Sequence, residues 1–129
     1  MTALEQAVNV QVNDYRATQG KPPLRLDSRI SNQARSHSQD MASGASTFDH
    51  QGFDQRVQAI AKVIPYRAAA ENVAYNQGYA EPVTQAVQGW LKSTGHRQNI
   101  EGQYDLTGIG VANNGKGEYY FTQIFIRSR

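Results

Sequence analysis

The chain has 129 residues, the size of one ordinary domain, and we expect a single domain over residues 1–129. It contains no cysteine, which excludes disulfides, thiolate metal sites and a cysteine nucleophile. The 13 lysines and arginines nearly balance the 11 aspartates and glutamates without forming a basic cluster, so nucleic acid is not an expected partner. No apolar stretch approaches the roughly 18 residues of a membrane span. No basic-then-apolar leader opens the sequence, so an exported protein would have lost its signal peptide.

Four segments carry the sequence signals of helices. Apolar residues recur in them at a spacing of three to four, as expected for one buried stripe of a helix. Asp27 is a suitable N-cap for the second segment. Pro82 suits the first turn of the fourth segment, which Gly95 is expected to end. The predicted helices span residues 2–19, 28–43, 53–63 and 82–94.

The last third of the chain has the composition of strands. Residues 106–111 and 119–126 are rich in β-branched and aromatic side chains, and an Asn-Gly pair between them indicates a hairpin. Residues 71–75 form a further candidate strand. Gly108 and Gly110 predict a close approach of a helix to the sheet. Helices followed by strands indicate an α+β fold, with helices packed on an antiparallel sheet.

Histidines and carboxylates are the strongest candidates for metal or acid–base chemistry in a chain without cysteine. His37 lies on the apolar stripe of the second predicted helix, so we interpret it as a hydrogen-bonded core histidine and not as a ligand. His50 and His96 fall in predicted loops, where functional groups concentrate, and Glu71 begins a candidate strand. Two imidazoles and a carboxylate can bind zinc. The alternative is that both histidines make only surface or structural hydrogen bonds, since their spacing matches no short zinc motif.

Short motifs follow one another along nearly the whole chain. They are Val12-Asn13, Pro23-Leu24, Ala34-x-x-His37-Ser38, Phe48-x-His50, Glu71-Asn72-Val73-Ala74, Trp90-x-x-Ser93-x-Gly95-His96-Arg97-x-Asn99-Ile100, Gly108-Ile109-Gly110-Val111 and Tyr120-x-Thr122-Gln123-x-Phe125. This ordered set resembles the CAP superfamily of cysteine-rich secretory, antigen 5 and pathogenesis-related proteins, in its cysteine-free bacterial SCP-like branch. The resemblance implies a three-layer α-β-α sandwich around a small antiparallel sheet of about three strands. It also implies an extracellular or periplasmic location.

The resemblance also implies a polar cleft. In better-described relatives two histidines and two glutamates face one cleft, and some members bind a divalent metal such as zinc there. His50 and Glu71 match the first histidine and the first glutamate, whereas the other two positions fall near Ser93 and on Tyr120. We therefore expect a ligand cleft formed by His50, Glu71, His96 and Tyr120. Within it, His50, Glu71 and His96 are the catalytic candidates, and His50 and His96 the candidate metal ligands.

Four further residues are expected to support this cleft. Trp90 is interpreted as a core anchor, and Asn72 is expected to fix the backbone around Glu71. Arg97 and Asn99 follow the fourth predicted helix, where they can bond its last free carbonyls and hold the next loop in place. A direct role of Arg97 and Asn99 in the cleft is the alternative.

Three functions are compatible with these residues. The first is a secreted monomeric binding module for a small amphipathic or lipid-like ligand or a divalent metal. The second is a metal-dependent hydrolase acting on extracellular peptide or cell-wall material, with Glu71 as a ligand or general base. The third is a structural or interaction domain with a vestigial cleft. The binding module is favoured, because the four-residue site of the relatives is incomplete here.

Overall fold

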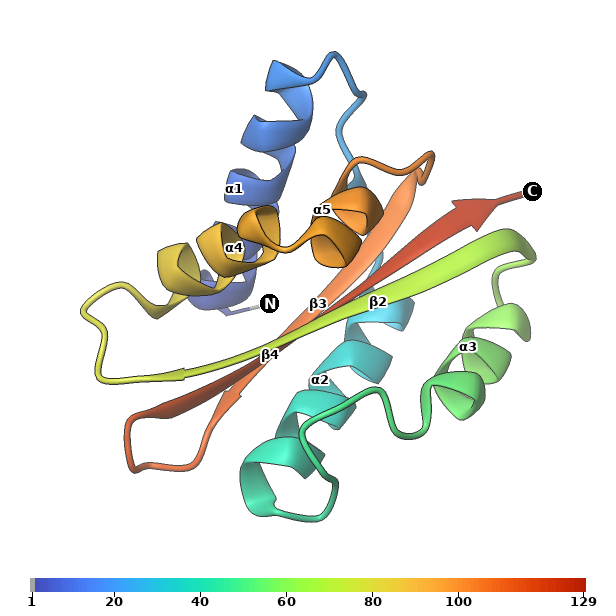
Figure 1. Cartoon of the computed structure of the whole chain (residues 1–129). Helices are drawn as coiled ribbons and strands as arrows, with labels where there is room; N and C mark the ends of the chain where they lie inside the picture. The colour runs from blue at the N-terminus through green and yellow to red at the C-terminus, as the bar shows by residue number, and fades with distance from the viewer. Residues whose placement is uncertain (1) are drawn as a thin grey trace.

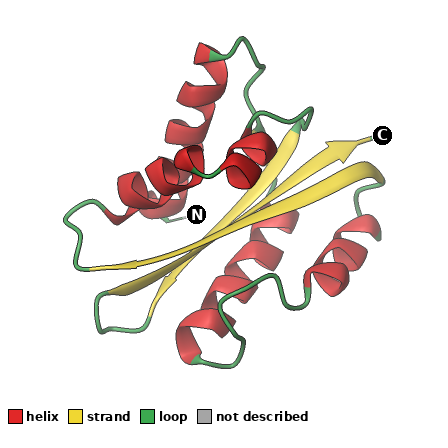
Figure 2. Cartoon of the chain, viewed as in Figure 1, coloured by secondary structure: helices red, strands yellow, loops and turns green. Residues whose placement is uncertain are grey.

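The computed structural model describes residues 2–129 and places one sheet between two helical layers (Figure 1). Helices α1, α4 and α5 cover one face of the sheet, and α2 and α3 cover the other (Figure 2). The predicted α+β class and three-layer α-β-α sandwich are thus confirmed. In chain order the elements are α1 (Ala3–Thr18), β1 (Arg25–Leu26), α2 (Ser28–Ser43), α3 (Phe53–Ala61), β2 (Tyr66–Gln77), α4 (Pro82–Lys92), α5 (Thr94–Ile100), β3 (Leu106–Asn113) and β4 (Glu118–Ser128).

Three helices begin at side chains or prolines that suit a helix start. Thr2 caps α1 in a capping box with Glu5. The Asp27 carboxylate accepts a hydrogen bond from the backbone N–H of Arg29 at 2.9 Å, so α2 starts where the sequence predicts. Pro82 occupies the first position of α4, where its missing N–H costs no helical hydrogen bond.

The predicted helix over residues 82–94 is divided into α4 and α5. Ser93 has an extended backbone, with φ −104° and ψ 121°, and serves as the N-cap of α5. Its hydroxyl lies 2.8 Å from Nδ1 of His96, which stands in the first turn of the new helix. Gly95 therefore lies inside α5 instead of ending a helix, and His96 is helical instead of lying in a loop.

The sheet has the strand order β1-β3-β4-β2. Strand β4 pairs antiparallel with β2 on one side and with β3 on the other. The predicted three-stranded antiparallel sheet is therefore present, and β1 adds a two-residue parallel strand through the pairing of Arg25 with Leu106. This addition explains why the sheet has four strands where about three were expected.

Strand β2 forms the edge opposite β1 and is longer than the predicted segment 71–75. Its side chains alternate between the two helical layers. Ala70 and Ala74 pack against the core cluster that contains Trp90, whereas Ala69 packs on the opposite face. The alanine run that obscured this strand in the sequence is thus partly buried on both faces, and this packing outweighs the helix propensity of alanine.

Helix α2 lies very close to β3. A Cβ atom added to Gly108 would lie 2.3 Å from the carbonyl carbon of Ile30, and one added to Gly110 would lie 2.2 Å from Cα of Arg35. The predicted close approach at this glycine pair is confirmed. It seats the helix that carries His37 directly on the centre of the sheet.

Candidate functional site

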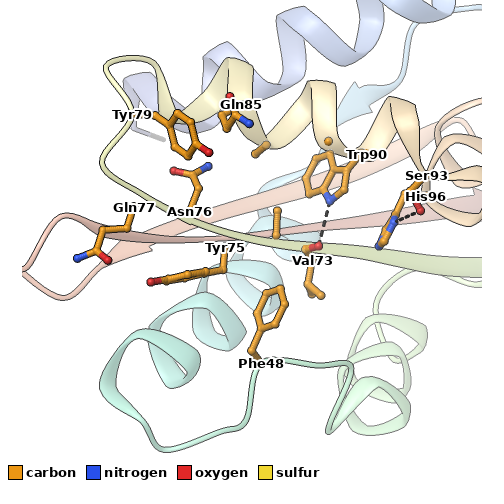
Figure 3. A pocket seen from close by; sticks show the side chains of 13 residues that line it. Phe48, Val73, Tyr75, Asn76, Gln77, Tyr79, Gln85, Trp90, Ser93 and His96 are labelled. Carbon is orange, nitrogen blue, oxygen red and sulfur yellow. Dashed lines mark hydrogen bonds between the residues drawn. The ribbon is translucent and has the colours of Figure 1, made fainter.

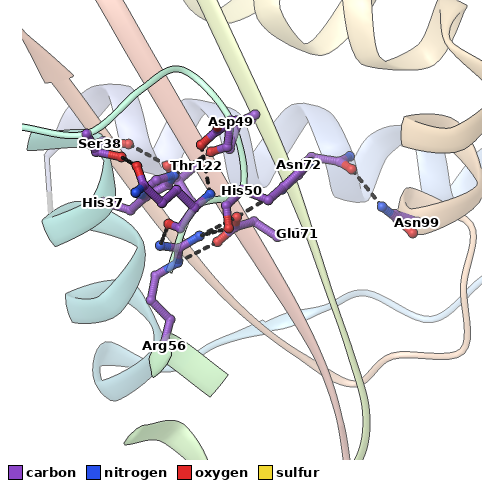
Figure 4. Close-up of polar contacts among 12 residues, drawn as sticks. His37, Ser38, Asp49, His50, Arg56, Glu71, Asn72, Asn99 and Thr122 are labelled. Atoms are coloured by element: carbon purple, nitrogen blue, oxygen red, sulfur yellow. Dashed lines mark hydrogen bonds and ion pairs between the residues drawn. The ribbon is translucent and has the colours of Figure 1, made fainter. Parts of the chain in front are cut away.

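A buried ion pair lies under one face of β2. The Glu71 side chain is only 1% exposed and receives two hydrogen bonds from Arg56, from Nε to Oε2 at 2.8 Å and from Nη2 to Oε1 at 2.6 Å. His50 lies on the same carboxylate, with Nδ1 3.0 Å from Oε1 (Figure 4). The structure therefore brings the predicted residues His50 and Glu71 together. It adds Arg56, which was not predicted from the sequence although it is adjacent to Val57 on the buried stripe of α3.

The loop before α3 is held in place by this cluster. Arg56 donates from Nη1 to the carbonyl of Gln51 at 2.7 Å and from Nη2 to that of His50 at 3.4 Å. From the other side, Nε2 of His37 lies 2.7 Å from the carbonyl oxygen of Asp49. His37 is 3% exposed, which confirms its interpretation as a hydrogen-bonded core histidine. The two side chains fix successive carbonyls of the loop that carries His50.

On the opposite face of β2, an amide network positions α5. Asn72 donates to the carbonyl of His96 at 3.1 Å and accepts from Nδ2 of Asn99 at 2.9 Å. Figure 4 shows the Asn72 side chain pointing away from Glu71 toward Asn99. Asn72 thus fixes the backbone of α5, not that of Glu71, because neighbouring strand residues face opposite sides of the sheet.

The predicted capping of the fourth helix by Arg97 and Asn99 is wrong. Both residues lie inside α5, because the chain re-enters a helix directly after Ser93. Arg97 instead extends toward Glu101 one turn later, at a distance of 4.0 Å. Its contact is an exposed pair of the kind that contributes little to stability.

His96 is expected to titrate below its ordinary pKa of 6.5. Burial lowers the pKa of His96, and the charge of His50 lowers it further. Since the unfolded chain then binds more protons, the free energy of unfolding should fall as the pH drops below 6.5, until His96 is protonated in the folded state as well. NMR titration of the His96 ring protons gives the pKa, and His96→Gln should reduce the pH dependence of stability. A folded-state pKa above 6.5 would contradict this assignment.

A cleft of about 600 Å³ wraps the outer edge of β2 over residues 73–77 (Figure 3). We call it the β2-edge cleft. Its lining residues are Phe48, Val73, Ala74, Tyr75, Asn76, Gln77, Tyr79, Gln85, Ala86, Gly89, Trp90, Ser93 and His96. Trp90 is 2% exposed and donates from its indole Nε1 to the carbonyl of Val73 at 3.0 Å. The core anchor predicted from the sequence therefore also forms the floor of a cleft.

Aromatic rings form the wall of the cleft on the α2 side. The ring centroids of Phe48 and Tyr75 are 6.2 Å apart, and Tyr120 lies behind them, 5.1 Å from Tyr75 and 6.4 Å from Phe48. Phe48 is 52% exposed and Tyr75 41%. Such half-exposed aromatic rings offer an apolar surface to a ligand.

One buried polar atom in the cleft has no partner. Asn76 is 7% exposed, and its Nδ2 donates to the carbonyl of Pro82 at 2.9 Å, which fixes the orientation of the amide. Its Oδ1 accepts no hydrogen bond from any residue that the structure describes. Buried polar atoms are nearly always bonded, but this oxygen is closed to solvent, as is the unpartnered Oε1 of Gln123 in the core, so a ligand in the cleft does not contact it directly.

The four residues of the predicted cleft fall into two neighbouring places. His96 lines the β2-edge cleft, and Tyr120 supports its aromatic wall. His50 and Glu71 line a separate hollow of about 230 Å³ with Phe53. Sequence spacing does not separate the two, because it does not show that His96 approaches β2 from the α5 side whereas His50 and Glu71 meet on the α3 side.

The donor set does not fit a divalent metal. Both oxygens of Glu71 are bonded to Arg56, whose guanidinium puts a permanent positive charge where a cation would bind. Within residues 2–129, no group of three or more histidine, aspartate or glutamate side chains is arranged to hold a metal ion. Zinc at a catalytic site takes three protein ligands.

Sequence comparisons identify the family to which this sandwich and cleft belong. The model of the cysteine-rich secretory protein family, CAP, matches residues 11–125. The chain is 35% identical to the protein YkwD of Bacillus subtilis strain 168, over 98% of the chain and 48% of YkwD. It is 31% identical to the membrane protein YlbC of the same organism, over 98% of the chain and 35% of YlbC. The chain belongs to the CAP family and spans less than half the length of these two relatives.

Solved structures agree with this assignment. An extracellular protein of Bacillus anthracis strain Ames that contains an SCP domain has a TM-score of 0.74 at 32% identity, over 96% of this chain and 40% of that one. An outer surface protein of Borrelia burgdorferi has a TM-score of 0.81 over 98% of this chain and 93% of that one, at 15% identity, and shares the fold. None of the helices within residues 2–129 is long and apolar enough to cross a membrane.

Proposed function

We propose that this chain is a binding module that acts outside the cell or in the periplasm and takes an amphipathic ligand into the β2-edge cleft. The aromatic wall carries the proposal, because Phe48 and Tyr75 remain 52% and 41% exposed beside a cleft lining without fixed charge. A ligand that covers these rings removes apolar surface from water, which favours binding by about 25 cal/mol per Å². The extracellular location is supported by the B. anthracis relative.

The cluster of His50, Arg56 and Glu71 supports binding better than hydrolysis. Glu71 is buried and its oxygens accept hydrogen bonds from Arg56 and His50, so the carboxylate is not placed as a free base for water. The same contacts hold the loop carbonyls of His50 and Gln51. We assign the cluster a positioning role, since this loop presents Phe48 to the cleft.

Octyl glucoside below its micellar concentration is a suitable probe, because it joins an apolar chain to a hydrogen-bonding head. The chain has one tryptophan, Trp90, so its selectively excited fluorescence reports directly from the cleft floor. We expect a saturable change in Trp90 fluorescence that weakens about tenfold in Phe48→Ala, as for the loss of one well-packed aromatic contact.

Val63→Ala is the matched control for this experiment. Val63 and Phe48 are both 52% exposed, but Val63 does not line the cleft. The control should bind the probe as the unsubstituted protein does. Equal affinity of all three proteins, or the absence of a saturable signal, would refute the cleft as the binding site.

A further inference from the structure

We propose that the ligand of the β2-edge cleft is an extended, uncharged peptide segment that adds to the sheet as a strand beside β2. This inference rests on the proposed binding function and specifies its ligand class. It follows from the backbone of β2, from the side chains above and below that backbone, and from the absence of fixed charge in the lining.

The outward direction of the β2 backbone follows from one side-chain contact. In a strand, the N–H and C=O of one residue point to the same side, and successive residues alternate between sides. The carbonyl of Val73 receives the Trp90 indole and therefore points away from β4. Tyr75 and Gln77 lie two and four residues after Val73 in the same strand, so their N–H and C=O groups also point away from β4.

These outward groups are available to a partner. Within residues 2–129, no turn, loop or side-chain hydrogen bond reaches the backbone of Tyr75 or Gln77, and their outward direction keeps these groups off β4; Trp90 bonds the carbonyl of Val73 alone. The exposed donors and acceptors recur every two residues, about 7 Å apart, which is the repeat of a second strand. A peptide backbone satisfies such a row, whereas a ligand without that repeat satisfies only part of it.

The edge also lacks the features that usually prevent strand addition. Natural edges are protected by charges, prolines, bulges or short length. Residues 72–77 contain no charged residue and no proline, and the only irregularity in the pairing of β2 with β4 lies between Tyr66 and Ala68 at the far end. This part of the edge is therefore open to the backbone of a strand-like partner.

The two walls define which side chains the added segment carries. On one side of β2, Phe48 and Tyr75 form the aromatic wall, which fits an apolar side chain. On the other side, Gln85 of α4 and Ser93 at its end line the cleft, which fits a hydrogen-bonding side chain such as that of serine, threonine or asparagine. His96 is the only ionisable side chain besides tyrosine in the lining, so a neutral segment with apolar and hydroxyl or amide side chains in alternation fits best.

The probe is a pool of acetylated, amidated pentapeptides in which Ser, Thr or Asn alternates with Leu, Val or Phe. Amide hydrogen exchange measures the effect of this pool on the edge. In the free protein the N–H groups of Tyr75 and Gln77 should exchange with solvent rapidly, whereas those of Ala74 and Asn76, which are bonded to β4, should exchange slowly. We expect the pool to slow exchange at Tyr75 and Gln77. N-methylation of every second peptide residue can remove either the N–H groups that point toward β2 or those that point away from it. We expect the first set of methylations to weaken binding about tenfold and the second to weaken it little. An equal effect of the two methylation patterns, or no effect of either, would contradict strand addition.

Gln77→Pro and Gln77→Ala form a matched pair of variants. Both remove the side-chain hydrogen bond of Gln77 to the carbonyl of Lys116, but only proline removes the outward N–H, which edge strands tolerate. We expect Gln77→Pro to bind the pool about tenfold more weakly than Gln77→Ala. Equal peptide binding by the two variants would contradict the inference. Binding of octyl glucoside without any peptide binding would overturn the peptide inference alone, and binding of neither would overturn the proposed function too.

Discussion

Arg56→Leu is expected to lower the free energy of unfolding by about 3–5 kcal/mol, because it leaves the Glu71 carboxylate buried without its charged partner. Glu71 is 1% exposed at the side chain and Arg56 is 9% exposed, so water cannot replace the lost contacts. Equilibrium unfolding in urea measures the change. The same variant should also weaken octyl glucoside binding, since Arg56 holds the loop that presents Phe48.

Two further variants distinguish the loss of the buried ion pair from the general effect of replacing an arginine by leucine. Arg67→Leu removes an exposed arginine on β2 and should change stability by less than about 0.5 kcal/mol. The double variant Arg56→Leu, Glu71→Leu leaves no unpaired charge and should be more stable than the sum of the two single losses predicts. Strict additivity of the two single changes would contradict a coupled buried pair.

Gly110→Ala is expected to cost about 2–3 kcal/mol in the free energy of unfolding. The new Cβ would lie 2.2 Å from both Cα and N of Arg35, which are backbone atoms of α2 and cannot rotate away. The helix would have to move off the sheet, and His37 would move with it. Urea unfolding again gives the measurement.

Gly95→Ala is the matched control for this prediction. Gly95 lies in α5 without a left-handed backbone, and a methyl group added there would project into open space. Alanine at this position should therefore be neutral or stabilising by up to about 1 kcal/mol. If Gly110→Ala were tolerated as well as Gly95→Ala, the close packing of α2 on β3 would not be a requirement of the fold.

The local signals in the sequence predict most of the fold, since each depends on a few neighbouring residues. The Asp27 cap, the apolar stripes and the Asn-Gly hairpin all specify elements that the structure contains. The glycine pair Gly108 and Gly110 even indicates which strand lies against a helix. The motifs shared with the CAP family supply the layer order, which no local signal gives.

The errors arise where tertiary contacts outweigh local signals. Glycine commonly ends a helix, so the sequence predicts a helix end at Gly95. In the structure, the Asn72 amide donates to the carbonyl of His96 and helps to place α5 against β2. Strand β1 has only two residues, too few to show the alternation of apolar and polar side chains that identifies a strand. The alanines before Glu71 favour a helix locally, whereas burial on both faces makes them part of β2.

The candidate site is predicted only in part, because it depends on which face of β2 each residue occupies. His50 and Glu71 are adjacent as expected, yet Arg56 completes their cluster through a contact between α3 and β2. The cleft itself depends on Phe48, Tyr75 and Asn76, none of which is a typical metal ligand or catalytic group. An aromatic two residues before His50 and a Tyr-Asn pair at the end of a strand are the signals that indicate them.

The β2-edge cleft as the binding site of this chain is the claim on which the proposed function depends. Backbone and indole NMR shifts recorded during titration with octyl glucoside test it most directly, because the single indole N–H of Trp90 gives one resonance. We predict saturable shifts at residues 73–77, at Gly89 and at the Trp90 indole. Shifts confined to other surfaces, such as the hollow beside His50 and Phe53 or the groove between α1 and α4, would contradict it.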